Sequence, residues 1–160
     1  MATQMMNALR SFFDEDDWGY VQLEDRAILK LGFTGENGNW SCYAQCREAD
    51  EQVVFYSICP ITVPEKKRIL VAELLTRANY GLVLGNFELD FDDGEIRYKT
   101  TADVQDGTLS QMMIKNAAYC NVLMMDKYLP GILAVIGGAQ SPKDAIDDIE
   151  SEDRQDMSKS

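Results

Sequence analysis

The sequence predicts an α+β protein in which helices pack on one antiparallel sheet. Three observations support this prediction. Segments that alternate between apolar and polar residues, as half-buried strands do, are joined by short polar turns, which favours antiparallel pairing. Segments with apolar residues three and four positions apart, which is typical of amphipathic helices, stand before, between and after these strands. A chain of 160 residues is long enough for one domain built from all of them.

A short amphipathic helix is expected first, over residues 2–14, where apolar side chains recur at helical spacing. Residues 27–33 and 40–46 then alternate between an apolar and a polar face, and residues 35–38 form a turn between these two strands. Residues 52–58 are apolar on both faces and form the next strand. The short connections predict an antiparallel meander of these three strands.

A second helix is expected to open near Thr62, because Thr62 and Glu65 have the spacing of a capping box. Two more strands follow, over residues 87–92 and 95–99, and both alternate strictly between apolar and polar positions. The Asp93-Gly94 pair lies between them. Asp-Gly between two alternating segments predicts a two-residue type I′ hairpin turn, whose central residues both need positive φ.

The longest helix is expected over residues 108–137, where Thr108 and Gln111 form a second capping box. Pro130 is expected to kink or divide this helix. Between residues 117 and 129 apolar side chains cover much of the helix circumference, so the helix must be covered on nearly all sides. The expected order is therefore α-β-β-β-α-β-β-α, with five strands.

Composition suggests two regions and limits the classes of partner. Residues 1–138 form the predicted domain, whereas residues 139–160 are polar and acidic and predict a disordered tail. The formal net charge of -12 argues against binding to nucleic acid or to anionic membranes, because both require Lys and Arg. No secretory signal or membrane-spanning apolar segment is evident. We therefore expect a cytoplasmic protein with reduced cysteines.

An acidic cluster at the predicted hairpin is the first candidate for a chemical site. An EF-hand loop that starts at Asp90 would need glycine at its sixth position, whereas Gly94 is the fifth, so we interpret the cluster as a turn. The acids on the polar strand face are expected to form cross-strand ion pairs. An enzyme that uses Asp90 or Asp92 with Arg97 or Lys99 is the third-ranked functional hypothesis.

The residues that most often perform catalysis or bind metals give little support for such a site. The chain has no histidine, which removes the usual general base and the commonest metal ligand. Cys42 and Cys46 would lie roughly 13 Å apart along a strand, too far for one metal ion or one disulfide. We interpret these two cysteines and Cys120 as core residues and expect Cys59 to be more exposed. We predict no catalytic residue, cofactor or metal.

Methionine and tyrosine side chains on the longest helix suit either a packed core or an adaptable binding surface. A five-stranded sheet packs such a helix on one side, which leaves its other side for a partner or a second copy of the chain. Both interpretations remain open. The candidate partner or dimer interface consists of Met113, Tyr119, Leu123, Met124 and Tyr128.

The order of the elements, together with Val63-Pro64, Asn79-Tyr80 and the segments 85–90 and 93–98, resembles the YbjN-like family of bacterial proteins. This family is named for sensory-transduction regulation and is similar in fold to type III secretion chaperones. The resemblance covers roughly residues 3–137. It implies helices packed on one antiparallel sheet, and a cytoplasmic, homodimeric protein that binds other proteins. It implies no catalytic residue.

The first functional hypothesis is a non-enzymatic protein-interaction module, chaperone-like or regulatory, that acts as a homodimer. Such a module would hold an extended segment of another protein on a sheet face or edge strand. The alternative is a small-molecule-sensing regulatory domain, with a pocket between sheet and helices near Trp40, Tyr56 and Tyr98.

Overall fold

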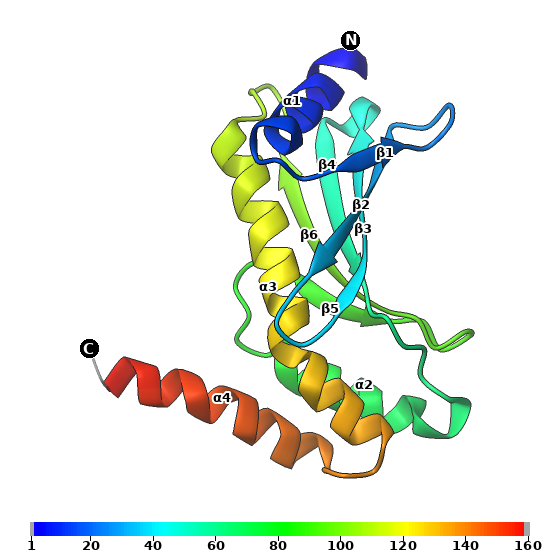
Figure 1. Cartoon of the computed structure of the whole chain (residues 1–160), viewed down its shortest axis with the longest axis vertical. Coiled ribbons are helices and arrows are strands. Elements are labelled where there is room, and N and C mark those ends of the chain that lie inside the picture. Colours follow the sequence, from blue (N-terminus) through cyan, green and yellow to red (C-terminus); the bar gives the residue numbers. More distant parts are fainter. Residues whose placement is uncertain (1, 159–160) are drawn as a thin grey trace.

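The structure is a computed structural model that describes residues 2–158. It confirms the predicted α+β class, with helices packed on one antiparallel sheet (Figure 1). The sheet has six strands in the order β1-β2-β3-β4-β6-β5, and every neighbouring pair is antiparallel. The strands are β1 (Tyr20–Gln22), β2 (Ile28–Thr34), β3 (Asn39–Arg47), β4 (Gln52–Ile58), β5 (Asn86–Leu89) and β6 (Ile96–Asp103).

The prediction of five strands was wrong by one, because it missed β1 at the edge of the sheet. This strand pairs with β2 through Tyr20↔Leu31 and Gln22↔Leu29. It is only three residues long. Alternation becomes recognisable over four or more residues, so a strand of this length carries no periodic signal.

The helices cover one face and one end of the sheet. They are α1 (Ala2–Glu15), α2 (Arg68–Asn79), α3 (Gln111–Ile136) and α4 (Pro142–Ser158), and two short 3₁₀ turns are η1 (Glu48–Asp50) and η2 (Glu65–Lys67). In Figure 1, α1 crosses the upper end of the sheet and α3 runs along it, whereas α2 and α4 lie at the lower end. No described helix lies on the opposite sheet face.

The core lies between the inner face of the sheet and the helices. Cys42 and Cys46 are buried there, as predicted. The expectation that Cys59 is more exposed was wrong: it is buried, and burial raises the pKa of its thiol to about 11. Cys120 is half-buried rather than fully enclosed, and its Sγ lies 3.5 Å from the carbonyl oxygen of Leu84.

Helix α2 begins later than the predicted capping box at Thr62. The backbone N–H of Val63 donates to the carbonyl of Gly94 at 2.9 Å, so the chain is tied to the β5–β6 loop at the point where a helix was expected. The first helical turn is η2, with Pro64 before it, and no described side chain caps η2. Because this long-range backbone bond competes with helix formation, the helical start moves to Glu65.

Helix α3 also begins later than predicted. Its cap is Ser110, whose hydroxyl accepts a hydrogen bond from the backbone N–H of Met113 at 3.1 Å, and not Thr108. The helix continues through Pro130 without being divided, over Gln111–Ile136. Ser110, two positions after Thr108, therefore caps the helix in place of Thr108.

The β5–β6 hairpin differs from the predicted two-residue type I′ turn. The N–H of Asp90 donates to the carbonyl of Glu95 at 2.9 Å, and the N–H of Gly94 donates to the carbonyl of Asp90 at 2.8 Å, so the loop is longer. Gly94 has φ +81°, and a Cβ there would lie 2.2 Å from the Val63 carbonyl oxygen. The close approach of the Val63 segment requires glycine, and Phe91 is displaced from the strand into this loop.

The prediction of a disordered tail was wrong for most of its length, because residues 142–158 form α4. Ala145 and Ile146 are buried against the rest of the chain, and Ile149 packs against the same core. The Ser141 hydroxyl accepts from the N–H of Asp144 at 3.1 Å and caps the helix. In Figure 1, α4 lies across the lower end of α3 and then projects beyond it.

Candidate functional site

The five residues of the predicted interface do not share one environment. Leu123 is 53% exposed, whereas Met113, Tyr119 and Met124 are half-buried. Tyr128 is 3% exposed and packs edge-on against Phe87, with the ring centroids 5.5 Å apart. Of this set, Leu123 is therefore the residue most accessible to a partner.

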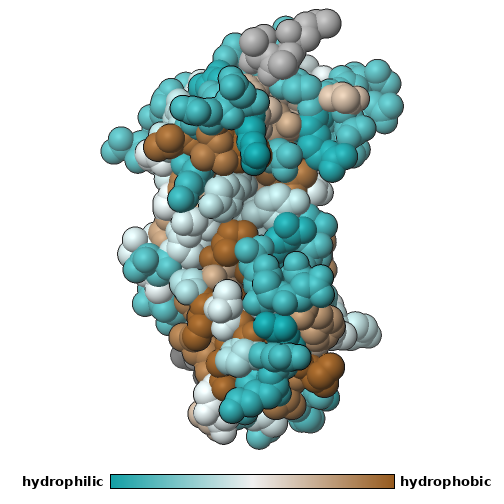
Figure 2. Space-filling model, turned by 90° about the vertical axis from the view of Figure 1, so that its right-hand side faces the viewer, coloured by the Kyte–Doolittle hydropathy of each residue, from teal (hydrophilic) through white to brown (hydrophobic). Residues whose placement is uncertain are grey.

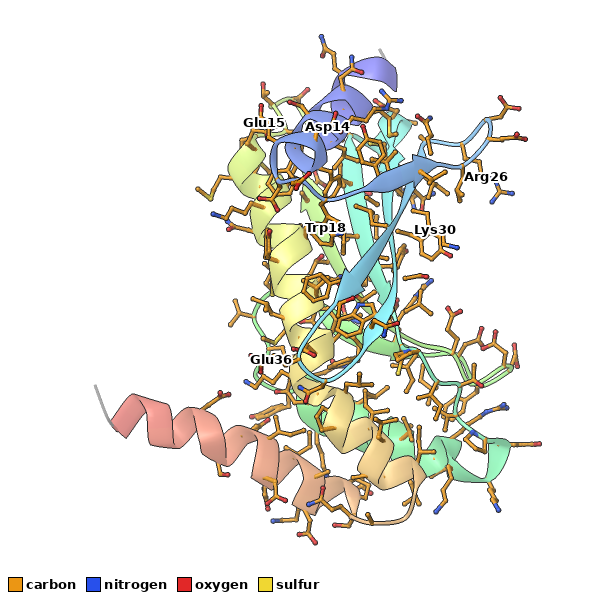
Figure 3. The ribbon with its side chains drawn as sticks, viewed as in Figure 1. Asp14, Glu15, Trp18, Arg26, Lys30 and Glu36 are labelled. Atoms are coloured by element: carbon orange, nitrogen blue, oxygen red, sulfur yellow. The ribbon has the colours of Figure 1, made fainter. Side chains whose placement is uncertain are left out.

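Tyr119 makes contacts within the chain that link α1 to α3. Its hydroxyl donates a hydrogen bond to the Asp16 carboxylate, and this bond raises the pKa of Tyr119. Its ring lies 5.8 Å from that of Trp18. Figure 3 shows Trp18 between α3 and the strands, while Asp14 and Glu15 lie at the end of α1. Both contacts of Tyr119, with Asp16 and with Trp18, are therefore made within the chain.

An exposed apolar loop that sequence reasoning missed lies between α2 and β5. In this α2–β5 loop, residues 80–85, Tyr80 is 90% exposed and Val83 is 100% exposed. The backbone nevertheless has fixed partners, since the Leu84 carbonyl accepts from the hydroxyl of Tyr98 at 2.7 Å. The Sγ of Cys120 lies close to the same carbonyl, which places the loop beside α3. Apolar side chains are therefore presented to solvent by an anchored backbone.

On another side of α3, the turn between β2 and β3 is held by Asp126. The carboxylate of Asp126 accepts from the N–H of Glu36 at 3.0 Å and from the N–H of Asn37 at 2.8 Å. The Asn37 side chain returns a bond to the Asp126 carbonyl at 2.9 Å. A Cβ at Gly35 would lie 2.4 Å from Asp126 Oδ1, so glycine permits this approach. Figure 3 shows Glu36 at the turn beside α3.

Two hollows lie between α3 and α4, one on each side of Lys127, and together they are named the α3–α4 groove. The larger, of about 900 Å³, lies between the β2–β3 turn, α3 and α4 and includes Leu123 and Asp148 in its wall. The smaller, of about 340 Å³, lies between the α2–β5 loop, α3 and α4. Lys127 forms an ion pair with Asp153 of α4. The groove therefore connects the predicted residue Leu123 with the α2–β5 loop.

A second exposed apolar group lies where α2 begins. Ile69 is 75% exposed, Leu70 is also exposed, and Phe91 of the β5–β6 loop is 52% exposed. Arg68 joins the two segments, because its Nη1 donates to the Phe91 carbonyl at 2.8 Å. Figure 2 shows hydrophobic residues at the surface toward the lower end of the face that it presents. We name this group the α2 patch.

The acidic residues at the hairpin form ion pairs and turn hydrogen bonds within the chain. Glu88 binds both cations of the neighbouring strand, with its carboxylate 2.7 Å from Arg97 Nε and 3.0 Å from Lys99 Nζ. Partial burial raises the pKa of Glu88, but the hydrogen bonds from Lys99 and Arg97 outweigh burial and the pKa is lowered. Asp90 instead accepts the N–H of Asp92 at 2.8 Å within the turn. The expected cross-strand ion pairing is confirmed at Glu88.

The three aromatic residues of the predicted small-molecule pocket do not converge. Trp40 and Tyr98 are buried in the core, whereas Tyr56 lies on the opposite face of the sheet, beneath Arg97 at 4.4 Å. Among the residues whose side chains the structure describes, no three His, Cys, Asp or Glu are placed to hold a metal ion together. Within the same residues, no helix has the length and apolar character needed to cross a membrane.

Comparison with known protein families identifies a family that this chain matches. A family described as "Putative bacterial sensory transduction regulator", YbjN, matches residues 6–134. Its match covers the chain from α1 to nearly the end of α3 and leaves α4 outside. No curated protein sequence matches the chain.

Two solved structures share the fold. The crystal structure of YbjN from E. coli superposes with a TM-score of 0.57 at 10% identity, covering 82% of this chain and 89% of the other. The structure of the HopA1-SchA chaperone-effector complex contains a chain that superposes with a TM-score of 0.51 at 16% identity, covering 81% and 93%. The resemblance in fold to a type III secretion chaperone is thereby confirmed. With the family matching most of its length, this chain belongs to the YbjN family.

Proposed function

We propose that this protein is a non-enzymatic protein-interaction module, chaperone-like or regulatory, which holds a segment of another protein and acts as a homodimer. The observation that carries the proposal is the exposure of Tyr80 and Val83 on the α2–β5 loop. Clustered exposed apolar side chains usually mark interaction sites, because leaving them in water is unfavourable.

The anchored backbone of the α2–β5 loop strengthens this interpretation. Leu84 is bonded to Tyr98, and the N–H of Leu82 donates to the carbonyl of Asn79 at 3.1 Å. A loop that is already ordered loses little conformational entropy when a partner covers it, so more of the apolar burial contributes to affinity. The exposed side chains are thus prepared for binding.

The comparisons support the same class of function. One structural neighbour was solved in a complex of a chaperone with its effector, which supports the holding of another protein's segment. The family description supports a regulatory role. We propose that the second copy of the homodimer contacts the α2 patch, because its apolar residues lie on elements other than the α2–β5 loop.

The test for a partner is affinity capture from a lysate of the native cell, read by mass spectrometry. Wild type is compared with Tyr80→Ser/Val83→Ser, which changes two exposed side chains and leaves the core intact. Val21→Ser, at an apolar residue of β1 that is also exposed, is the matched control. We expect one near-stoichiometric partner with wild type and the control, and its loss with the double variant. Equal capture by all three proteins would refute the role of the loop, and capture of nothing would refute the interaction module.

The homodimer is tested separately by sedimentation equilibrium of the purified protein. We expect twice the mass of one chain for wild type and the single-chain mass for Ile69→Glu/Phe91→Glu, because each change places a charge in the proposed apolar contact. A wild-type protein that stays monomeric at every concentration measured would contradict the homodimer.

A further inference from the structure

Helix α4 lies outside the part of the chain that matches the family, and it forms one wall of the α3–α4 groove. This wall is acidic. Asp148 faces the larger hollow, and Glu150 and Asp153 face the smaller one. Among the described residues that line either hollow, Lys127 is the one cation, and it is already paired with Asp153. The groove therefore presents unbalanced negative charge.

Apolar side chains stand at both ends of this acidic wall. Leu123 of α3 lines the larger hollow, and Tyr80 of the α2–β5 loop lines the smaller one, and both are exposed. Opposite-charge patterns set which partners dock, whereas apolar anchors supply most of the affinity. A ligand that complements the groove must therefore carry both cations and apolar groups.

We propose that the α3–α4 groove binds a basic amphipathic segment of the partner protein. Apolar side chains of this segment contact Leu123 and Tyr80, and its Lys or Arg side chains pair with Asp148 and Glu150. This inference rests on the proposed function and specifies the chemical class of the partner. A second copy of the chain is a poor occupant, because its own α4 is acidic and would be repelled.

The ion pair between Lys127 and Asp153 lies where the two hollows meet. Both side chains are partly exposed, and ion pairs of this kind are weak because water competes for each charge. A cation of the bound segment can therefore pair with Asp153 in place of Lys127. This exchange joins the two hollows into one binding site.

The experiment uses the full chain and a fluorescent peptide of about 14 residues in which Leu and Lys alternate at helical spacing, together with a matched peptide in which Glu replaces Lys. Binding is followed by fluorescence anisotropy. The groove variant is Asp148→Lys/Glu150→Lys. The control variant, Glu24→Lys/Asp92→Lys, has the same change in net charge at exposed positions in the β1–β2 and β5–β6 loops.

We expect the Lys peptide to bind wild type, and both the Glu peptide and the groove variant to weaken binding by about tenfold or more. The control variant should change affinity by less than about threefold, as expected for distant surface charges. Equal weakening by the groove and control variants would show attraction to net charge only and would overturn the proposal. So would the absence of binding to wild type.

A second variant guards against a folding defect in the charge-reversed helix. Leu123→Ser changes an exposed side chain and leaves α4 intact, so unchanged peptide affinity in this variant would also overturn the proposal. If the groove variant captures the native partner as wild type does, the groove is not the binding site of the partner, while the proposed function stands. If wild type captures no partner, the proposed function fails, and the peptide titration still decides the chemistry of the groove.

Discussion

The side chain of Asn79 takes the place of a neighbouring strand for Phe87. Its Oδ1 accepts from the Phe87 N–H at 2.7 Å, and its Nδ2 donates to the Phe87 carbonyl at 3.1 Å. Phe87 lies in β5, which is an edge strand of the sheet. An unpaired edge strand can add a strand from another chain, so Asn79 closes this edge.

Replacing Asn79 with Ala should lower the free energy of unfolding by about 1 kcal/mol or more, because the Phe87 N–H loses its acceptor while the Phe87 carbonyl keeps the bond from Asn86 Nδ2 at 3.2 Å. It should also open β5 to association. Chemical denaturation measures the first effect and sedimentation velocity over a range of concentrations measures the second. Asn79→Asp is the matched control, since Asp can accept from Phe87 N–H but cannot donate to its carbonyl, and an intermediate loss is expected. Unchanged stability in both variants would contradict this role.

The Asp126 contact should decide the order of the β2–β3 turn. In Asp126→Ala the N–H groups of Glu36 and Asn37 lose their acceptor, which should cost about 2 kcal/mol of stability. Amide hydrogen exchange at these two residues should become faster while exchange in β4 is unchanged. Asn116→Ala, at an exposed position of α3, is the control. Equally slow exchange in wild type and Asp126→Ala would show that the turn is held by other contacts.

Stability should depend on the charge of Glu88 at acidic pH. Its pKa is lowered in the folded state, so its ion pairs stabilise the fold above the ordinary glutamate pKa of about 4.3, and this contribution is lost as pH falls through the folded value. At pH 7 wild type should exceed Glu88→Gln by no more than about 1 kcal/mol, because solvent screens the partly exposed pair. Urea denaturation against pH measures the difference, which should shrink below about pH 4. A constant difference would contradict the ion pair.

The docking of α4 should depend on its buried apolar residues. Ala145→Asp places a charge at a fully buried position, and it should detach α4 because an unpaired buried charge is strongly unfavourable. Hydrogen exchange within residues 142–150 should rise markedly, while protection of β3 and β4 remains. Lys143→Asp, on the exposed side of the helix, is the control. Fast exchange of α4 in wild type would show that the predicted tail was disordered after all.

The elements that could be predicted from sequence are those with a strong local period. Alternation in residues 40–46 and 52–58 identified β3 and β4, since their inner faces meet one core. Helix α4 was missed because its apolar stripe is narrow and its stability comes from tertiary contacts with α2 and α3, which the local sequence pattern does not show. The start of α2 moved for a similar reason, because the bond between Val63 and Gly94 joins segments that are distant in sequence.

The candidate site was predictable in part. Leu123 was identified on the apolar helix, and it is exposed. Tyr128 belongs to the same helix but is buried, because it packs against Phe87 of β5. Helical periodicity could not predict this, since it does not say which elements pack on a helix that is apolar on many sides. The α2–β5 loop did carry a signal: apolar residues 82–84 stand between two glycines in a segment too short for a helix.

Whether a partner protein binds at the α2–β5 loop is best measured by a hydrogen exchange footprint of the protein with its captured partner. We expect slower exchange at residues 80–85 and in α3 around Leu123, because the partner covers this surface. We expect no change on the outer sheet face around Tyr43 and Tyr56, which lie opposite each other on β3 and β4. Protection confined to that sheet face, with the α2–β5 loop unaffected, would show that the partner does not bind at the loop.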